Sequence, residues 1–188
     1  MEYFNIDGST NACFALFHGT GGNEYSLLQI AGDIDANARI VSFIGDVGEK
    51  EHRRFFAPLA NGQLVRDDFN ARIERFLAQW DELAIEGDVT LLGFSNGANF
   101  LLGVLEQRPN IADRVVLLHP SNLQYTFNGT HATKLYITAG ALDTLAIPGD
   151  TMKLAKQLEQ HFPVTMKLFD GAHNVSDEEI TYLQKVLA

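Results

Sequence analysis

The stretch DVTLLGFSNGANFLLGVLEQR, residues 88–108, carries a serine with a glycine two positions away on each side. The apolar residues before the serine predict a buried strand, and the apolar residues after it predict a helix. Ser95 therefore falls at a turn from strand to helix, where the pattern Gly-x-Ser-x-Gly is typical of a nucleophile elbow. Small residues flanking that turn let strand and helix pass closely, so the hydroxyl stands clear at the carboxyl edge of the sheet. The alternative is a glycine-rich turn with an incidental serine.

Outward from this stretch, predicted strands and helices alternate along the chain. The strands are apolar throughout rather than at every second residue, which is typical of a parallel sheet with helices on both faces. We therefore expect an α/β fold with a mostly parallel sheet of about six to seven strands, no large lid domain, and a single domain over residues 1–188. Further strands are predicted at 13–19, 39–46, 114–120, 134–140 and 164–171, and further helices at 23–34, 67–84, 148–162 and 177–187.

The composition is that of an ordinary soluble globular protein: 46% of the residues are hydrophobic, 20% are charged, and the net charge is −10. Such an acidic chain repels the phosphates of nucleic acids and anionic membrane surfaces. No apolar run approaches the ~18 residues that a membrane span needs, and no signal peptide is visible. A single cysteine, Cys13, excludes an intramolecular disulfide. We therefore expect a cytoplasmic protein that neither binds nucleic acid nor inserts into a membrane.

A serine hydroxyl is a poor nucleophile without a base, and the chain has six histidines. His173 follows the last predicted strand and precedes the last helix, from where its ring can reach back over the sheet edge to Ser95. It is therefore the candidate base. His119 also ends a strand and is interpreted as a hydrogen-bonded edge histidine, whereas the backbone of His18 is expected to matter more than its ring. The others, His52, His131 and His161, are interpreted as solvated.

The histidine needs a carboxylate that accepts a hydrogen bond from its ring and stabilises the imidazolium. Asp143 comes three residues after the strand at 134–140 and gives the order nucleophile, carboxylate, histidine along the chain. Its rival is Asp170, three residues before His173, which we expect to cap the turn at Gly171. The order of the chain elements favours Asp143, although a simple turn aspartate is the alternative.

The glycine-rich segment HGTGGN, residues 18–23, lies between a predicted strand and a predicted helix. Acyl transfer passes through a tetrahedral oxyanion, which needs N–H donors aimed at it. The backbone N–H of Asn96, directly after the serine, is one candidate, and the backbone N–H of Thr20 is the second. A phosphate-binding loop is the alternative, but the segment matches neither G-x-G-x-x-G nor G-x-x-x-x-G-K-[ST].

Four motifs in this order, HGTGGNEYSLLQIA, GFSNGAN, GALDTLAIP and DGAHNVSDEE, resemble the phospholipase/carboxylesterase branch of the α/β-hydrolase superfamily. That branch includes bacterial carboxylesterases and acyl-protein thioesterases, and the resemblance covers essentially the whole chain. It implies Ser95 as nucleophile, Asp143 as acid, His173 as base, and Thr20 and Asn96 as oxyanion donors.

Two further comparisons refine this resemblance. The segment RRFFAPLANG, residues 53–62, is similar to an arginine-and-phenylalanine segment of bacterial carboxylesterases, some of them associated with quinone and catechol stress. The dienelactone hydrolases, which lie near this branch, use a cysteine nucleophile where this chain has Ser95, which argues against that activity.

These features predict a serine carboxylesterase that hydrolyses small, short-acyl esters through an acyl-enzyme, without a metal or an organic cofactor. The alternatives are an acyl thioesterase or lysophospholipase-like hydrolase, and a catalytically silent ligand-binding protein on a hydrolase fold. The connection 45–66, with Phe55 and Phe56, either walls the substrate pocket or packs two aromatic rings into the core. The sequence does not name the physiological substrate, and whether the protein forms a homodimer stays open.

Overall fold

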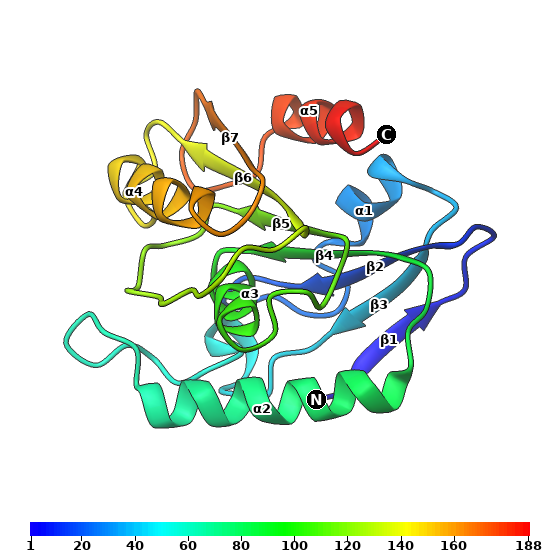
Figure 1. The fold of residues 1–188 in the computed structure, drawn as a ribbon, viewed down its shortest axis with the longest axis horizontal. Helices are drawn as coiled ribbons and strands as arrows, with labels where there is room; N and C mark the ends of the chain where they lie inside the picture. Colours follow the sequence, from blue (N-terminus) through cyan, green and yellow to red (C-terminus); the bar gives the residue numbers. More distant parts are fainter.

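A seven-stranded β-sheet forms the centre of the molecule in the computed structural model, which describes residues 1–188. Its strands are β1 (Tyr3–Ile6), β2 (Ala12–Phe17), β3 (Arg39–Phe43), β4 (Asp88–Phe94), β5 (Arg114–Leu118), β6 (Lys134–Gly140) and β7 (Val164–Phe169). They lie in the order β1-β3-β2-β4-β5-β6-β7, and every neighbouring pair is parallel except β1 and β3 (Figure 1). The predicted mostly parallel sheet is confirmed.

Helices cover both faces of this sheet, as predicted (Figure 1). They are α1 (Leu28–Ile34), α2 (Arg66–Leu83), α3 (Asn96–Gln107), α4 (Pro148–Glu159) and α5 (Asp177–Leu187), with a short 3₁₀ helix, η1 (Lys50–His52), in the connection after β3. Helices α2, α3 and α4 pack into the larger of two core clusters, and α1 and α5 pack into the smaller one. Successive residues of a strand point to opposite faces of the sheet. On β2, Phe17 therefore belongs to the larger cluster and Leu16 to the smaller one.

The two edges of the sheet differ from the prediction. Strand β1 was not predicted, because its four residues are all exposed and its order comes from antiparallel pairing with β3 rather than from burial. The predicted last strand at 164–171 is confirmed as β7, but it is the opposite edge, and Thr165, Lys167 and Leu168 are exposed although the predicted strands are apolar throughout. The pattern of apolar residues predicts buried strands better than it predicts strands that pair at the edge of a sheet.

Helix α1 begins at Leu28, five residues later than the predicted start at 23. The side chain of Asn23 accepts a hydrogen bond from the Tyr25 N–H, and the Ser26 hydroxyl accepts one from the Asn23 N–H. Such local side-chain bonds offer the backbone an alternative to the helix. The segment therefore forms turns before the helix begins.

The carboxyl ends of the parallel strands meet at one edge of the sheet, and this edge positions the candidate site. The turn after β4 carries Ser95, β5 is followed by His119, the loop after β6 carries Asp143, and the loop after β7 carries His173. None of the helices has the length and apolar character that crossing a lipid bilayer requires.

Candidate active site

Ser95 lies in a strained turn between β4 and α3. Its φ of 52° and ψ of −110° belong to a region that residues other than glycine seldom adopt. A Cβ atom at Gly97 would lie 2.0 Å from the carbonyl oxygen of Phe17, and one at Gly93 would lie 2.8 Å from the amide nitrogen of Ala98. Both flanking glycines are therefore required by the close approach of backbone segments, as the sequence pattern predicted.

The structure brings together Ser95, His173 and Asp143, which come from three different loops. The Nε2 atom of His173 lies 2.8 Å from the Ser95 Oγ, and its Nδ1 atom lies 2.7 Å from the Asp143 Oδ2. Because an ionised carboxylate only accepts hydrogen bonds, the ring proton sits on Nδ1. The Nε2 lone pair then faces the serine hydroxyl.

The carboxylate of Asp143 is fully enclosed and receives four hydrogen bonds. Its Oδ1 accepts from the backbone N–H groups of Leu145 and Ala146, and its Oδ2 accepts from the Nδ1 atoms of His173 and His119. Burial would raise the pKa of Asp143, but the bonds from Ala146, His173 and His119 outweigh burial and lower it below its ordinary value. Asp143 is therefore ionised at neutral pH.

Asp170, the rival carboxylate, is exposed and makes no hydrogen bond with His173. It also makes no side-chain bond to the turn at Gly171, where a cap was predicted. The backbone there is held instead by the Leu142 N–H, which donates to the Gly171 carbonyl. Geometry therefore favours Asp143 over Asp170 as the partner of the histidine.

The two candidate oxyanion donors lie on either side of the elbow. Asn96 is the first residue of α3, so its N–H has no acceptor within the helix. Thr20 lies in the turn after β2, and its N–H has no acceptor in the protein. The turn is held by its neighbours, since the Gly22 N–H donates to Gly19 and the Gly21 N–H donates to Arg53. Both backbone donors are free to bind an incoming oxygen.

The ring of His18 holds the start of this turn by hydrogen bonds. The sequence analysis expected the backbone of His18, not its ring, to matter. Its Nδ1 lies 2.7 Å from the Gly19 carbonyl oxygen, and its Nε2 accepts from the Gly45 N–H at 2.9 Å. A carbonyl only accepts and an amide N–H only donates, so the ring is neutral with its proton on Nδ1. Burial lowers the pKa of His18 below its ordinary value, which agrees with a neutral ring.

The connection 45–66 braces the turn after β2 and the elbow. Arg53 accepts from the Gly21 N–H, and the Phe55 N–H donates to the side chain of Asn96 at 2.8 Å. The Phe55 and Phe56 side chains are 0% and 1% exposed and belong to the core. Their positions therefore match the packing interpretation rather than the pocket wall.

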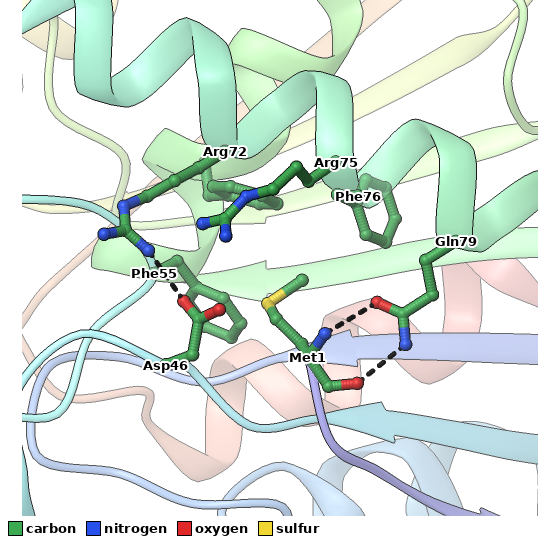
Figure 2. A pocket seen from close by; sticks show the side chains of 8 residues that line it. Met1, Asp46, Phe55, Arg72, Arg75, Phe76 and Gln79 are labelled. Atoms are coloured by element: carbon green, nitrogen blue, oxygen red, sulfur yellow. Dashed lines mark hydrogen bonds and ion pairs between the residues drawn. The ribbon is translucent and has the colours of Figure 1, made fainter.

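Phe55 instead borders a small cavity of about 70 Å³ under α2 (Figure 2). Arg72 pairs with Asp46 there at 3.0 Å, and the side chain of Gln79 bonds both the amino group and the carbonyl of Met1. This cavity is lined by none of the candidate catalytic residues. Arg72, Asp46, Gln79 and Met1 pair among themselves, so we assign this cavity no chemistry.

A larger pocket of about 240 Å³ opens beside the candidate catalytic atoms. Gly19 and Thr20 line it from the turn after β2, and residues adjoining Ser95 and His173 line it from the other side. Its apolar lining residues are Leu27, Ile30, Phe94 and Val175. A pocket of this kind accommodates a small, partly apolar group next to the serine.

Two buried residues of the site were missed by the sequence analysis. His119 was placed correctly at a strand end, but its ring contacts Asp143 and, through Nε2, both carboxylate oxygens of Glu179 at 3.1 Å. Glu179 was predicted only as part of the capping box with Ser176, which the structure confirms. The 60 residues between His119 and Glu179 leave no local pattern that links them.

His119, Asp143 and His173 also have a donor set that could suit a metal ion, because one ligand atom from each lies within 4.8 Å of the others. Here, however, the Nδ1 atoms of both histidines already bond to the Asp143 Oδ2, and no buried polar side-chain atom lacks a partner. A metal could bind only by displacing these hydrogen bonds.

Comparison with known proteins shows that the fold is shared with hydrolases. No model of a known protein family matches the sequence. The chain is 27% identical to the "Putative hydrolase MhqD" of Bacillus subtilis (strain 168), over 95% of this chain and 94% of that protein. It superimposes on the crystal structure of the Bacillus cereus carboxylesterase with a TM-score of 0.92 and 27% identity, covering 100% of this chain and 93% of that one.

A third relative is a protein of unknown function from Agrobacterium tumefaciens str. C58. The two chains are 30% identical, with a TM-score of 0.84 and coverage of 98% and 94% respectively. The chain therefore has the α/β-hydrolase fold, and like the hydrolase and the carboxylesterase that it resembles, it is a hydrolase.

Proposed function

We propose that this protein is a serine carboxylesterase that hydrolyses small, short-acyl carboxylic esters. The observation that carries the proposal is the His173 ring, which joins the Ser95 hydroxyl at 2.8 Å to the Asp143 carboxylate at 2.7 Å. This is the arrangement of nucleophile, base and orienting carboxylate that activates a serine. The named carboxylesterase among its relatives supports an ester as the substrate class.

In the first step, Ser95 Oγ bonds to the ester carbonyl carbon while His173 Nε2 takes the hydroxyl proton. The carbonyl oxygen becomes an oxyanion, for which the free N–H groups of Thr20 and Asn96 are the proposed donors. The bond to the alkoxy group then breaks, and His173 returns its proton to the departing alcohol. An acyl group is left on Ser95.

In the second step, His173 takes a proton from water, and the resulting hydroxide attacks the acyl carbon. The same backbone donors face the second oxyanion. The bond to Ser95 breaks, the serine regains its proton from His173, and the carboxylic acid leaves. The ionised Asp143 stabilises the imidazolium in both steps.

The size of the pocket supports a small substrate. At about 240 Å³ it is smaller than the roughly 300–1,000 Å³ that drug-sized ligands occupy. Ile30 and Val175 supply apolar surface to it. We therefore expect p-nitrophenyl esters of about two to six acyl carbons to give the highest kcat/KM, with a decline at longer chains.

A fluorophosphonate probe tests the nucleophile directly. The wild-type protein should be labelled at Ser95, Ser95→Ala should not be labelled, and Ser9→Ala, at an exposed serine remote from the site, should be labelled normally. An acyl-length series of esters, run beside matched thioesters, tests the substrate class. A folded protein that is never labelled at Ser95 would refute the esterase, and a higher kcat/KM on thioesters would make it a thioesterase.

A further inference from the structure

We propose that His119 and Glu179 form a second imidazole–carboxylate pair behind Asp143, which positions the carboxylate that orients His173. Neither residue touches the substrate pocket, so both are positioning residues. The proposal rests on the proposed esterase function, and its tests are chosen so that the two can fail separately.

The first observation is that one oxygen of Asp143 lies between two imidazoles. Its Oδ2 is 2.7 Å from the Nδ1 of His173 and 3.1 Å from the Nδ1 of His119. The two rings are 5.6 Å apart between centroids and nearly perpendicular, at 82°. The side chains of His119 and Asp143 are 1% and 0% exposed, so water does not screen this contact. The His119 ring therefore acts on the same oxygen that must stabilise protonated His173.

The second observation is that both nitrogens of His119 face carboxylates. Nδ1 faces Asp143, and Nε2 lies 3.1 Å from each oxygen of Glu179. Ionised carboxylates only accept, so both ring nitrogens must carry protons, and the ring is an imidazolium. Burial would lower the pKa of His119, but Glu179 and, secondly, Asp143 outweigh burial and raise it.

The third observation is that Glu179 is itself held firmly. Its side chain is 1% exposed, and it accepts hydrogen bonds from the Ser176 backbone N–H and from the Thr138 hydroxyl, in addition to His119. It lies in the first turn of α5, where the helix dipole favours a negative charge. The pair therefore ties the ends of β5 and β6 to α5, directly beneath Asp143.

The backbone of His119 gives independent support. Its φ is 51°, in the left-handed region that favours glycine, and yet the position carries a large aromatic residue. Strained residues of this kind persist where the surroundings over-determine them, and they cluster at functional sites. In this backbone conformation, the ring contacts both carboxylates.

The groups that face the two histidines show which contact the pair controls. Facing His119 are Asp143 from the loop after β6, Glu179 from α5, His173 from the loop after β7, and the uncharged ring of Phe94. Facing His173 are Asp143, His119, the ring of Phe94 and the Ser95 hydroxyl. Asp143 is the charged side chain that hydrogen-bonds both histidines, so the pair acts on His173 through the position of this carboxylate.

Glu179→Gln tests the pair with little change of shape, because glutamine also completes a capping box. Without the Glu179 charge, the Nε2 of His119 loses its anionic partner, while Nδ1 can still donate to Asp143. We expect kcat to fall about three- to tenfold with KM within about twofold, because the orientation of His173 matters in the reaction and not in binding. A residue that merely supports the fold would lower the melting temperature without this selective loss of kcat.

Two controls sharpen this experiment. Glu178→Gln makes the same change at the exposed neighbouring position of the same helix turn, and it should leave both kcat and KM unchanged. His119→Gln should lower kcat, and adding Glu179→Gln to it should cost little more, because residues that act as one unit are not additive. If the losses of kcat in the two single variants add up in the double variant, the two residues act independently, which contradicts the proposed pair.

The protonation state of His119 can be measured without an activity assay. In protein labelled with ¹⁵N-histidine, the His119 ring should keep both nitrogens protonated to a higher pH than an ordinary histidine, because its pKa is raised. The signal is assigned by its loss in His119→Gln. If the wild-type protein cleaves no ester and is not labelled, the esterase proposal fails while this measurement still decides the pair. A His119 ring that loses a proton in the ordinary histidine range, or a folded Glu179→Gln with the wild-type kcat, overturns the inference.

Discussion

The Nε2 atom of His173 lies 2.8 Å from the Ser95 hydroxyl oxygen, although 78 positions separate the two residues in the chain. The parallel sheet creates this contact, because it places the ends of β4 and β7 at the same edge. Asp143 then fixes the ring from the opposite nitrogen at 2.7 Å. The contact thus depends on three loops that the sheet holds in register, and each can be tested separately.

Asp143→Asn is expected to lower kcat/KM on an activated ester by about 10²–10⁴. Asparagine keeps the shape but loses the charge, and its amide favours the wrong imidazole tautomer; the upper figure is borrowed from the corresponding change in a serine protease. Asp170→Asn is the matched control and should cost less than about tenfold, because Asp170 is exposed and does not contact the histidine. Circular dichroism checks that both variants fold. An inactive 170 variant beside a normal 143 variant would show that the orienting carboxylate is misassigned.

The local parts of this fold could be predicted from the sequence because their causes are local. The turn at Ser95 needs glycines at 93 and 97, and the structure shows the two close backbone contacts that require them. The capping box at Ser176 and Glu179 is likewise local and is present. Helical periodicity located α2, which buries Phe69, Ile73 and Trp80 on one face.

The parts that could not be predicted arise from contacts between distant residues. No local sequence pattern predicts the contact between His119 and Glu179. The same is true of the hydrogen bond from the Gly45 N–H to the ring of His18. Strand β1 was missed for the same reason, since antiparallel pairing with β3 rather than apolar burial orders it. Phe55 and Phe56 left two interpretations open because an aromatic pair in a long connection fits a pocket wall as well as a core.

The neutral His18 ring should make the protein less stable in acid. Its pKa is lowered in the folded state, mainly by burial, so the unfolded chain binds a proton more readily than the native chain. Stability from this group is therefore present above the ordinary histidine value of about 6.5 and is lost as the pH falls below it. The loss should disappear in His18→Gln, which can accept from the Gly45 N–H without titrating.

Urea unfolding of the wild-type protein and of His18→Gln at several pH values between about 5 and 7.5 measures this difference. The free energy of unfolding of the wild type should fall relative to the variant toward the acid end. His131→Gln, at a half-buried histidine whose Nε2 bonds only a loop carbonyl, serves as the control. Parallel pH dependence in the wild type and His18→Gln would contradict a neutral His18.

Gly97→Ala should destabilise the fold by about 3 kcal/mol or more, because the new methyl group would collide with a backbone oxygen that cannot move freely. The added Cβ would lie 2.0 Å from the Phe17 carbonyl oxygen. Gly32→Ala is the matched control: it lies in α1, where an added Cβ meets nothing within 4 Å. It should stabilise the protein by roughly 0.5–1 kcal/mol through helix propensity. Urea unfolding of both variants measures these effects, and a stable Gly97→Ala would refute the close packing of α3 on β2.

Ile30→Ala should shift the preferred acyl length upward by about one or two carbons, because Ile30 lines the apolar side of the pocket beside the serine. Loss of its side chain makes room for a longer group and removes contact with the shortest ones, so kcat/KM for the shortest esters should fall about three- to tenfold. Ile34→Ala makes the same change one helical turn further along α1, at a residue that packs into the smaller core cluster and does not line the pocket. It should change stability but not the order of preference. The two variants are compared by kcat/KM over one series of p-nitrophenyl esters. If Ile30→Ala and Ile34→Ala show the same dependence of kcat/KM on acyl length, this pocket does not bind the acyl chain.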